Sequence, residues 1–475
     1  MFSSTVYLIN SLRLNTCRPS SVAASPIYGA GSYRKGVKWA ILGGGLSGVT
    51  IARILHGKGH EVVVLERQGE IGGLCRSRSE QGFTFDRGGS HIIFSRDQGA
   101  LAFMQGVLGE NRSVRDRNTV VFYKGKEVPY PFENGLSALP KEDLYLCIHG
   151  FIQALIAHEK GVVPPPANFR EWIDTTFGRG IADCYLVPYN EKIWKYPLEK
   201  MSTHWVEGRI PRPPVEDVIR AAIGIPTVGY AHQAVFSYPT VGGIQAMVRA
   251  IAAPVEKHIR TGCSVNSVRK EGRQYVVSDG KETIRADRVI STIPLQALLP
   301  CLTDVPEPVG EACRNLKYNS LFSVSLGIRG TVPPVSWMYV PGKDLGQFNR
   351  ISFPSSYSDA VAPAGHAAIL AEITFRDGDP VASLTDEQLV EHVVSGLCRM
   401  GILSSPEAVV YSHVDREPFA YVIYDLDYLH NIRIVRDHVE GRGIDLLGRF
   451  ARFEYLNMDA CIRAAMDFAE DIPCA

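Results

Sequence analysis

The spacing of hydrophobic residues changes sharply near the start of the chain. Residues 39–42 form a short apolar run, residues 46–55 repeat apolar positions at helical spacing, and residues 61–65 are again mostly apolar. A short apolar run is typical of a buried strand, and a 3.6-residue period is typical of an amphipathic helix. We therefore predict a strand–helix–strand unit over residues 39–66.

Three glycines connect the first predicted strand to the helix. Gly43, Gly45 and Gly48 form a GxGxxG motif, and Glu66 ends the second strand. Gly43 allows a tight turn, Gly45 lets the backbone approach a pyrophosphate, and Gly48 lets the helix pack closely on the strand. The helix N-terminus would face the phosphates, and Glu66 would accept hydrogen bonds from ribose hydroxyls. This order of elements predicts a dinucleotide-binding site.

Two later regions carry patterns that fit the same lobe. Residues 262–280 alternate as a β-meander does, and residues 286–294 are typical of a buried strand and its turn. Residues 446–469 begin with a strand and a glycine, and a helix follows from Met458 or Asp459. Such a helix start presents backbone N–H groups to a ligand. We expect one lobe assembled from three separated chain segments.

Two long insertions separate these segments. The first has helical periodicity at 141–160, 169–185 and 215–223, and the second contains strand-like runs such as SLFSVSLGIRG and AAILAEITF. The stretch PYNEKIWKYP (188–197) mixes aromatic and polar residues without a clear period of either kind. We expect an α/β fold with a Rossmann-like lobe, a helical insert, and a mixed or antiparallel sheet that forms the substrate lobe. The predicted divisions are a leader (1–36), lobe segments (37–129, 236–300 and 411–475), the helical insert (130–235) and the sheet lobe (301–410).

The overall composition limits the partners of the chain. Among 475 residues, 50 Lys and Arg balance 50 Asp and Glu, so no global field attracts nucleic acid, and an anionic ligand must be held by local arginines. The ten cysteines are scattered singly, which argues against structural zinc, a disulfide framework and an oxidising compartment. No apolar run is long enough for a transmembrane segment. The oligomeric state is not evident from the sequence.

The first 36 residues differ in composition from the rest. They contain no Asp or Glu but carry Arg13, Arg18, Arg34 and Lys35 among many small and hydroxyl residues. This composition suits a mitochondrial or plastid transit peptide. We nevertheless expect a disordered leader without an address, in a cytoplasmic protein, with mitochondrial or plastid targeting as the alternative, and the sequence leaves open whether this segment is removed.

The residues after Glu66 distinguish between cofactors. A plain NAD domain would continue into another helix and strand, but here a loop with Gly72, Gly73 and Arg76 leads to a hairpin-like segment that ends in DRGG (86–89). This continuation resembles the FAD family that includes amine oxidases, protoporphyrinogen oxidases and UDP-galactopyranose mutases. The resemblance implies FAD, bound by Gly43, Gly45, Gly48, Glu66, Arg67, Gly73, Leu74, Arg76, Gly89, Ser90, His91, Val265, Gly448, Arg449, Asn457 and Met458.

Blocks within the first insertion narrow the resemblance. VPYPFENGLSALPKED (128–143), FREWIDTTFGRGIAD (169–183), PYNEKIWKYPLEKM (188–201) and HWVEGRI (204–210) follow one another, with GGSHIIF (88–94) upstream. From about residue 38 onward the chain is similar to UDP-galactopyranose mutase. The resemblance implies an FAD-dependent isomerase that interconverts the pyranose and furanose forms of a UDP-hexose, with N5 of the reduced flavin as nucleophile on the anomeric carbon. NAD(P)H is a candidate reductant.

The same resemblance implies roles for individual residues. Two guanidinium forks can neutralise a diphosphate bidentately, and Arg209 and Arg350 match the arginines that do so in the family. The expected catalytic residues are His91, Arg209, Arg350, Tyr357, Tyr455 and Asn457. The expected substrate-binding residues are Phe132, Asn190, Trp194, Arg209, Arg350, Tyr357, Tyr424 and Tyr455. We select Tyr424 over two neighbouring tyrosines, Tyr421 and Tyr428, for the sugar site.

The sequence departs from the family pattern at three places. Glu133 stands where glutamine is usual, and a carboxylate cannot donate a hydrogen bond to a uracil carbonyl. Asn457 stands where aspartate is common, and residues 417–428 offer three tyrosines for one position. The identity of the sugar and of the nucleotide therefore stays open.

Two other functions use the same FAD lobe. An oxidoreductase of the amine oxidase or protoporphyrinogen oxidase type would consume oxygen and would need an apolar cage rather than paired arginines. A flavin carrier without a substrate of its own would not need so many polar aromatic residues in the insertions. The arginine pair favours the mutase.

Overall fold

The computed structural model describes residues 36–206, 210, 212–227 and 234–475. Nearly all of the predicted leader lies outside these residues, and so does Arg209. None of the helices in the described part of the chain combines the length and the apolar character that a membrane span requires.

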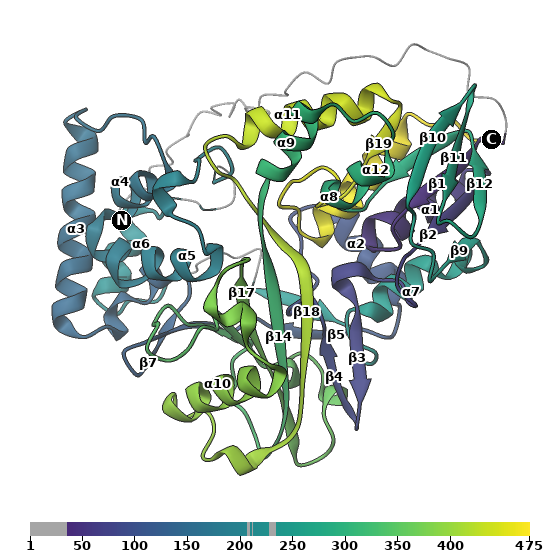
Figure 1. Ribbon diagram of the computed structural model, residues 1–475. Helices are drawn as coiled ribbons and strands as arrows, with labels where there is room; N and C mark the ends of the chain where they lie inside the picture. Colours follow the sequence, from purple (N-terminus) through teal and green to yellow (C-terminus); the bar gives the residue numbers. More distant parts are fainter. Residues whose placement is uncertain (1–35, 207–209, 211, 228–233) are drawn as a thin grey trace, which may run out of the picture. The chain divides into compact units, whose positions relative to one another are not determined.

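A five-stranded parallel sheet forms the expected Rossmann-like lobe, with strand order β19-β13-β1-β2-β9. Trp39 of β1 lies between Val62 of β2 and Arg288 of β13, so segments far apart in sequence are adjacent in the sheet. Figure 1 shows this as purple, teal and yellow ribbons running together. The strands are β1 (Lys38–Leu42), β2 (Glu61–Leu65), β9 (Ile259–Arg260), β13 (Arg288–Ser291) and β19 (Ile444–Leu446).

Helices from the same segments cover this sheet. Ile51 and Leu55 of α1 share an apolar core with Trp39 and with Ala465 and Ala469 of α12. The helices are α1 (Leu46–Gly57), α7 (Gln245–Ala252) and α12 (Met458–Glu470), and the expected meander is β10 (Ser267–Glu271), β11 (Gln274–Ser278) and β12 (Thr283–Ala286). The predicted α/β lobe built from three chain segments is therefore confirmed.

A seven-stranded sheet forms the second lobe, with strand order β18-β14-β17-β16-β15-β6-β7. All neighbours are antiparallel except β15 and β6, so the predicted mixed sheet is confirmed. One face packs against Leu389, Val393 and Leu397 of α10 (Asp386–Arg399). The strands are β6 (Thr119–Tyr123), β7 (Lys126–Pro129), β14 (Lys317–Arg329), β15 (Trp337–Tyr339), β16 (Arg350–Ser352), β17 (His366–Phe375) and β18 (Val409–Ile423).

The helical insert lies beside this sheet, at the left in Figure 1. Its helices α3 and α4 meet at glycines: a Cβ on Gly180 would lie 2.0 Å from the carbonyl oxygen of Leu146. The main elements are α3 (Lys141–Glu159), α4 (Phe169–Ile181), the π-helix η4 (Ala182–Leu186), α5 (Val187–Trp194) and α6 (Val215–Ala222).

The stretch without a clear period is helical. Residues 187–194 form α5, which continues directly from η4 with Pro188 near its start and ends at Lys195 in the left-handed conformation. Two of its polar residues are buried: Lys192 contacts the sheet lobe, and Asn190 forms hydrogen bonds within the helical insert. Because buried positions of this helix include polar residues, its sequence lacks the clean separation of apolar and polar faces that marks an amphipathic helix.

The remaining connections complete the lobes. They include α2 (Gln98–Leu108), α8 (Leu295–Leu298), α9 (Glu307–Asn315), α11 (Tyr428–Gly441), the hairpin β3 (Ser77–Glu80) and β4 (Phe83–Asp86), and the pair β5 (Ser113–Asp116) and β8 (Val235–Tyr238).

Candidate functional site

One cavity of about 1070 Å³ runs from the glycine motif to α5. Its walls come from all three parts of the fold: the parallel-sheet lobe, the helical insert and the seven-stranded sheet. Of the predicted site residues, it is lined by Gly43, Gly45, Glu66, Arg67, Gly73, Leu74, Arg76, Ser90, His91, Asn190, Trp194, Val265, Arg350, Arg449, Tyr455, Asn457 and Met458.

The glycine turn has the geometry that the motif requires. Gly43 has φ +101°, and a Cβ on Gly48 would lie 2.0 Å from the carbonyl oxygen of Gly43, so neither position accommodates a larger residue without a shift. Gly45 is the N-cap of α1, and no side chain caps this helix. The first N–H groups of α1 are thus left to a ligand in the cavity.

Glu66 is held at the end of β2 by backbone groups. Its Oε2 accepts from the Gly44 N–H at 2.7 Å, and its Oε1 accepts from the Gln68 N–H at 2.8 Å. A carboxylate oxygen has two lone pairs, so each oxygen can still accept from a ligand hydroxyl.

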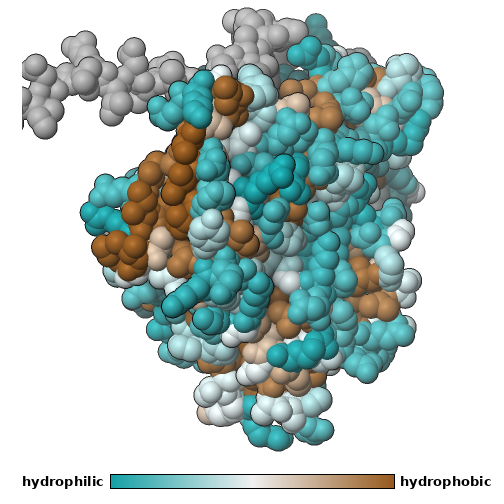
Figure 2. Space-filling model, turned by 90° about the vertical axis from the view of Figure 1, so that its left-hand side faces the viewer, coloured by the Kyte–Doolittle hydropathy of each residue, from teal (hydrophilic) through white to brown (hydrophobic). Residues whose placement is uncertain are grey.

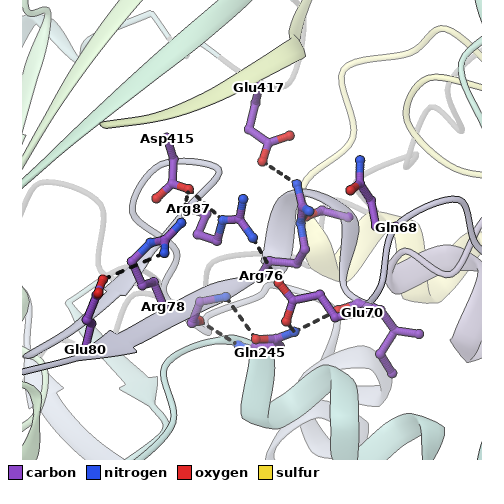
Figure 3. Close-up of polar contacts among 12 residues, drawn as sticks. Gln68, Glu70, Arg76, Arg78, Glu80, Arg87, Gln245, Asp415 and Glu417 are labelled. Carbon is purple, nitrogen blue, oxygen red and sulfur yellow. Dashed lines mark hydrogen bonds and ion pairs between the residues drawn. The ribbon is translucent and has the colours of Figure 1, made fainter. Parts of the chain in front are cut away.

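The loop after Glu66 is tied to strand β18 by ion pairs (Figure 3). Arg76 donates to Glu417 at 2.6 Å, and both side chains are mostly buried. Arg87 and Arg78 both contact Asp415, at 2.7 and 3.2 Å. Two carboxylates on one strand therefore fix the arginine-bearing loop and hairpin against the seven-stranded sheet, and Arg76 enters the cavity wall with its charge already balanced.

His91 lies in the cavity wall next to this loop. Its Nδ1 is 2.8 Å from the carbonyl oxygen of Gly89. Burial, with smaller contributions from Arg350 and Arg449, lowers the pKa of His91 to about 4. A neutral imidazole that donates from Nδ1 leaves Nε2 as an acceptor near neutral pH.

Arg350 points from β16 and is paired inside the protein. Its Nε and Nη2 donate to the two carboxylate oxygens of Glu372, each at 2.8 Å, and Glu372 is fully buried. Glu372 also accepts from the Ser90 N–H at 3.0 Å. These two hydrogen bonds to Glu372 fix the plane of the Arg350 guanidinium and occupy its Nε and Nη2 nitrogens. The Nη1 nitrogen is therefore the one that can contact a ligand.

Arg449 lies in the cavity wall among aromatic rings. Its guanidinium carbon lies 4.4 Å from the ring centre of Tyr455 and 5.3 Å from that of Tyr421. Its Nε is buried and has no hydrogen-bond partner among the described residues. A buried donor without a partner is costly, so a ligand acceptor at this position would stabilise it.

Helix α5 supplies a rigid wall. The Nε1 of Trp194 donates to Asn190 Oδ1 at 2.9 Å, and Asn190 Nδ2 donates to the Leu186 carbonyl at 2.7 Å. Lys192 anchors the helix to the sheet lobe, because its Nζ donates to the carbonyls of Val340 and Gly342 at 2.9 and 2.6 Å. The side chains that face the cavity are therefore in place without a ligand.

Comparison with known sequences identifies the family. The family described as flavin containing amine oxidoreductase matches residues 46–434. The chain belongs to this family. It is 23% identical to Protoporphyrinogen oxidase 1, chloroplastic, of Arabidopsis thaliana over 447 residues, which cover 82% of this chain and 81% of that protein. A UDP-galactopyranose mutase of Mycoplasma pneumoniae is 31% identical over 67 residues, which are 14% of this chain and 17% of that protein.

A solved structure extends the likeness to the mutases. The crystal structure of reduced UDP-galactopyranose mutase superposes with a TM-score of 0.83 at 27% identity, covering 91% of this chain and 95% of that one. The predicted resemblance is confirmed, and this member of the amine oxidoreductase family is a flavoprotein whose cofactor is FAD.

The residues of this flavoprotein fit FAD at three separate points. The uncapped start of α1 suits a diphosphate, Glu66 suits a ribose, and the buried Nε of Arg449 suits a flavin acceptor. The start of α12 at Met458 has no side-chain cap either, and Asn457 and Met458 line the cavity. These groups would hold the cofactor along the length of the parallel-sheet lobe.

Several predicted site residues do not line the cavity. Phe132 is fully buried and stacks on Tyr185, with ring centres 5.0 Å apart. The Tyr357 hydroxyl lies 2.8 Å from Ser90 Oγ, and burial raises its pKa to about 12, so it supports the loop of Ser90 from behind. Gly48, Gly89 and Gly448 shape the backbone next to the cavity, and Arg209 lies outside the described residues.

None of the three candidate tyrosines, Tyr421, Tyr424 and Tyr428, is among the described residues that line the cavity. The Tyr424 hydroxyl accepts from the Tyr455 N–H at 2.6 Å, away from the cavity wall. Tyr421 instead lies against Tyr455 and Trp194, with ring centres 5.6 and 6.2 Å apart. Both tyrosines thus contact Tyr455, which lines the cavity, and the assignment of Tyr424 to the sugar site stays a prediction.

Sequence reasoning missed part of the cavity wall. Arg117 lines it and lies over the rings of Trp337 and Tyr130, at 4.7 and 5.3 Å. Tyr339 packs between Tyr130 and Tyr189. Tyr130 and Tyr189 are inside the blocks VPYPF and PYNEK, so the blocks that matched the family were the available signal.

Proposed function

We propose that this flavoprotein is a nucleotide-sugar mutase that interconverts the pyranose and furanose forms of a UDP-hexose. The observation that carries the proposal is the single cavity that joins the FAD cradle to Arg350 and to the aromatic wall of α5. Such a cavity suits a ligand with an anionic centre, a planar base and a polar sugar. The likeness to reduced UDP-galactopyranose mutase supports the same conclusion.

Bound and reduced, the flavin would supply a nucleophilic nitrogen. The protein's part is then to hold the sugar beside it and to stabilise the diphosphate as it leaves. Arg350, fixed by Glu372, offers its Nη1 side to a phosphate oxygen at no reorganisation cost. We assign Arg209 as the second cation of this clamp, and Tyr455 and Asn457 as hydrogen-bonding groups at the sugar end. Because His91 is neutral, it adds no charge that competes with the arginines.

The base would lie along α5. Trp194 and Tyr189 offer apolar faces, and the Asn190 amide retains one N–H and one lone pair after its two internal hydrogen bonds. Phe132 and Tyr185 support this wall from behind rather than touching the cavity. Tyr357 supports the loop that carries Ser90 and His91 in the same way.

A protoporphyrinogen oxidase-type reaction is the second candidate, and the relative from Arabidopsis thaliana favours it because the match covers most of both chains. Its tetrapyrrole substrate is large, flat and apolar over most of its area. The cavity wall instead includes the guanidinium groups of Arg117 and Arg350 and the phenol group of Tyr339. That lining suits the nucleotide sugar better.

The two functions separate in one experiment. The purified holoenzyme is reduced under anaerobic conditions and given UDP-galactofuranose, and the products are separated by chromatography. Appearance of UDP-galactopyranose in the absence of oxygen supports the mutase. No conversion, together with peroxide formation from protoporphyrinogen or an amine in air, would show that the mutase proposal is wrong.

A further inference from the structure

Two thiols from separate helices meet inside the helical insert. Helix α3 lies on the side of the molecule that Figure 2 shows, and its inner side buries Cys147. Cys184, on the π-helix η4, is partly exposed, and a side-chain hydrogen bond links it to the Cys147 thiol. Neither cysteine is among the described residues that line the cavity. The proposed mechanism therefore has no use for this pair.

The crossing of α3 and α4 brings the two thiols together. A Cβ on Gly180 would lie 2.5 Å from the Cα of Cys147, and Cys184 follows Gly180 by four residues, about one helical turn. A Cβ on Gly178 would lie 2.2 Å from the carbonyl oxygen of Gly150, so the two backbones touch over more than one turn. A disulfide requires Cα atoms within about 7 Å of each other. The glycines of this crossing allow two segments to approach in the way that such a bond demands.

The groups around Cys184 stabilise its thiolate. Cys147 and Tyr123 donate hydrogen bonds to its sulfur, and Lys124 adds a positive charge, whereas burial and Asp143 oppose ionisation. Asp143 is itself paired with Lys124, whose Nζ lies 2.7 and 3.0 Å from its carboxylate oxygens. The net result lowers the pKa of Cys184, while the hydrogen bond to Cys184 and burial raise the pKa of Cys147. One thiol of the pair thus ionises first, as a nucleophile must.

We propose that Cys184 is a peroxide-reactive thiol and that Cys147 converts its oxidised form to a disulfide between η4 and α3. The Cys184 thiolate attacks one oxygen of hydrogen peroxide, the O–O bond breaks, and the departing hydroxide takes up a proton to form water. The Cys147 sulfur then attacks the sulfenic acid on Cys184. An S–S bond replaces the S–O bond, and the Cys147 proton leaves with the second hydroxide as water. The two thiols lose two electrons, and the peroxide gains them.

Other cysteines of the described chain lack this combination. Cys263 is also partly exposed, but burial and Asp279 raise its pKa to about 11, so little thiolate forms near neutral pH. Cys75 and Cys461 lie near each other, but both are buried, and burial raises the pKa of each. We therefore expect oxidation to select the pair of Cys184 and Cys147.

The disulfide would also alter the cavity wall. An S–S bond of about 2.05 Å is shorter than the contact between two free thiols, so η4 must move toward α3. The π-helix continues directly into α5, and Tyr185 stacks on Tyr189 of the cavity wall with ring centres 5.4 Å apart. The oxidised protein should therefore bind UDP more weakly than the reduced protein, an expectation that rests on the proposed function.

Peroxide treatment of the purified holoenzyme, followed by peptide mapping without reductant, tests the thiol pair. We expect one disulfide, between the peptides that contain Cys147 and Cys184, and dithiothreitol should reverse it. Cys147→Ser should stop at the sulfenic acid on Cys184, which dimedone labels. In Cys184→Ser, Cys147 should stay reduced. Cys263→Ser is the matched control and should form the disulfide at the wild-type rate.

Alkylation at pH 7 gives a second readout that needs no variant. Iodoacetamide should modify Cys184 about tenfold or more faster than Cys263 in the same reduced protein, because it reacts with thiolates and the two pKa values are shifted in opposite directions. Tyr123→Phe should slow the reaction at Cys184, since the thiolate loses a hydrogen-bond donor. Retained FAD absorbance shows that each variant is folded.

Three results would overturn the proposal. They are equal alkylation rates of Cys184 and Cys263, peroxide-treated protein in which both thiols of the pair stay reduced, and wild-type protein that accumulates sulfenic acid without the disulfide. Equal UDP affinity of the oxidised and reduced forms would refute the effect on the cavity wall. Absence of UDP binding by the reduced protein would count against the proposed function instead, because the peptide map alone decides the thiol chemistry.

Discussion

Arg350 is a cation that the fold has already paired. Glu372 holds two of its nitrogens, and the same carboxylate accepts from the loop that carries Ser90 and His91. A surface arginine would have to be ordered each time a ligand binds, but this one is held in advance. Glu372 therefore sets both the orientation of Arg350 and the position of the loop next to it.

Replacing Arg350 by lysine tests this arrangement. Arg350→Lys keeps the charge but cannot form the fork with Glu372, so we expect turnover in the mutase assay to fall on the order of 10²-fold while FAD stays bound. Arg285→Lys, on the exposed edge of the meander, is the control and should match the wild type. Equal turnover in both variants would remove Arg350 from the mechanism.

Glu133 is a buried carboxylic acid, and its surroundings disfavour the ionised form. Only 5% of its surface is exposed, and burial raises its pKa from 4.5 to about 7. The folded state then binds more protons than the unfolded state between these values, so Glu133 should cost stability progressively as the pH rises from about 4.5 to 7. When protonated, it can donate a hydrogen bond, as a glutamine amide at this position would.

Glu133→Gln should remove this pH dependence. We expect equal stability of both proteins near pH 4.5 and a more stable variant above pH 7, by at most on the order of 3 kcal/mol. Urea midpoints measured across this pH range test it. If the urea midpoints of the two proteins changed with pH in the same way, ionisation of Glu133 would have no cost in folding stability, and the prediction would be wrong.

At the scale of elements, α3 and α4 cross at very short range. A Cβ on Gly180 would lie 2.5 Å from Cys147 Cα and 2.0 Å from the Leu146 carbonyl oxygen. Two helices can approach this closely only where one of them lacks a side chain. The position of η4 and α5, which follow α4 directly, depends on this crossing.

Gly180→Ala should therefore push the two helices apart. We expect a loss of about 1–3 kcal/mol in unfolding free energy, as for other overpacked contacts, and weaker UDP affinity because the α5 wall moves. Gly106→Ala in α2 is the matched control: it is also a helical glycine, but an added Cβ there meets nothing within 4 Å. That variant should be neutral or slightly stabilised.

The elements that the sequence predicted well are those with regular local patterns. The strand–helix–strand unit around Gly43 and the helices at 141–160 and 169–185 have clear periods and were placed nearly to the residue. Helix α5 was missed because tertiary contacts cover its polar residues, as with Lys192 and the carbonyls of Val340 and Gly342. Glu372 and Glu417 were missed for another reason: each acts through a partner more than twenty residues away in sequence.

At the scale of the whole molecule, bound FAD should stabilise the fold by joining distant segments of the chain. The groups assigned to it lie on α1, on the loop after β2 and at the start of α12, which are far apart in the chain. Removing FAD should lower stability, by about 4 kcal/mol where free FAD exceeds its dissociation constant a thousandfold. Thermal unfolding of holo and apo protein, followed by circular dichroism, measures it. An unchanged midpoint after complete removal of FAD would show that the lobe closes without it.

The order of strands in the parallel sheet also has a consequence for biosynthesis. Strand β1 leaves the ribosome early, but its neighbour β13 and the edge strand β19 follow only after about 250 and 400 further residues. At ordinary translation rates the last strand appears on the order of a minute after the first. Until β13 appears, the edge of β1 away from β2 has no final neighbour, and until β19 appears the same holds for the outer edge of β13, so these edges are open to aggregation or to chaperones. Slow codons or a chaperone shortage should therefore harm the yield of this protein far more than its stability once it is complete.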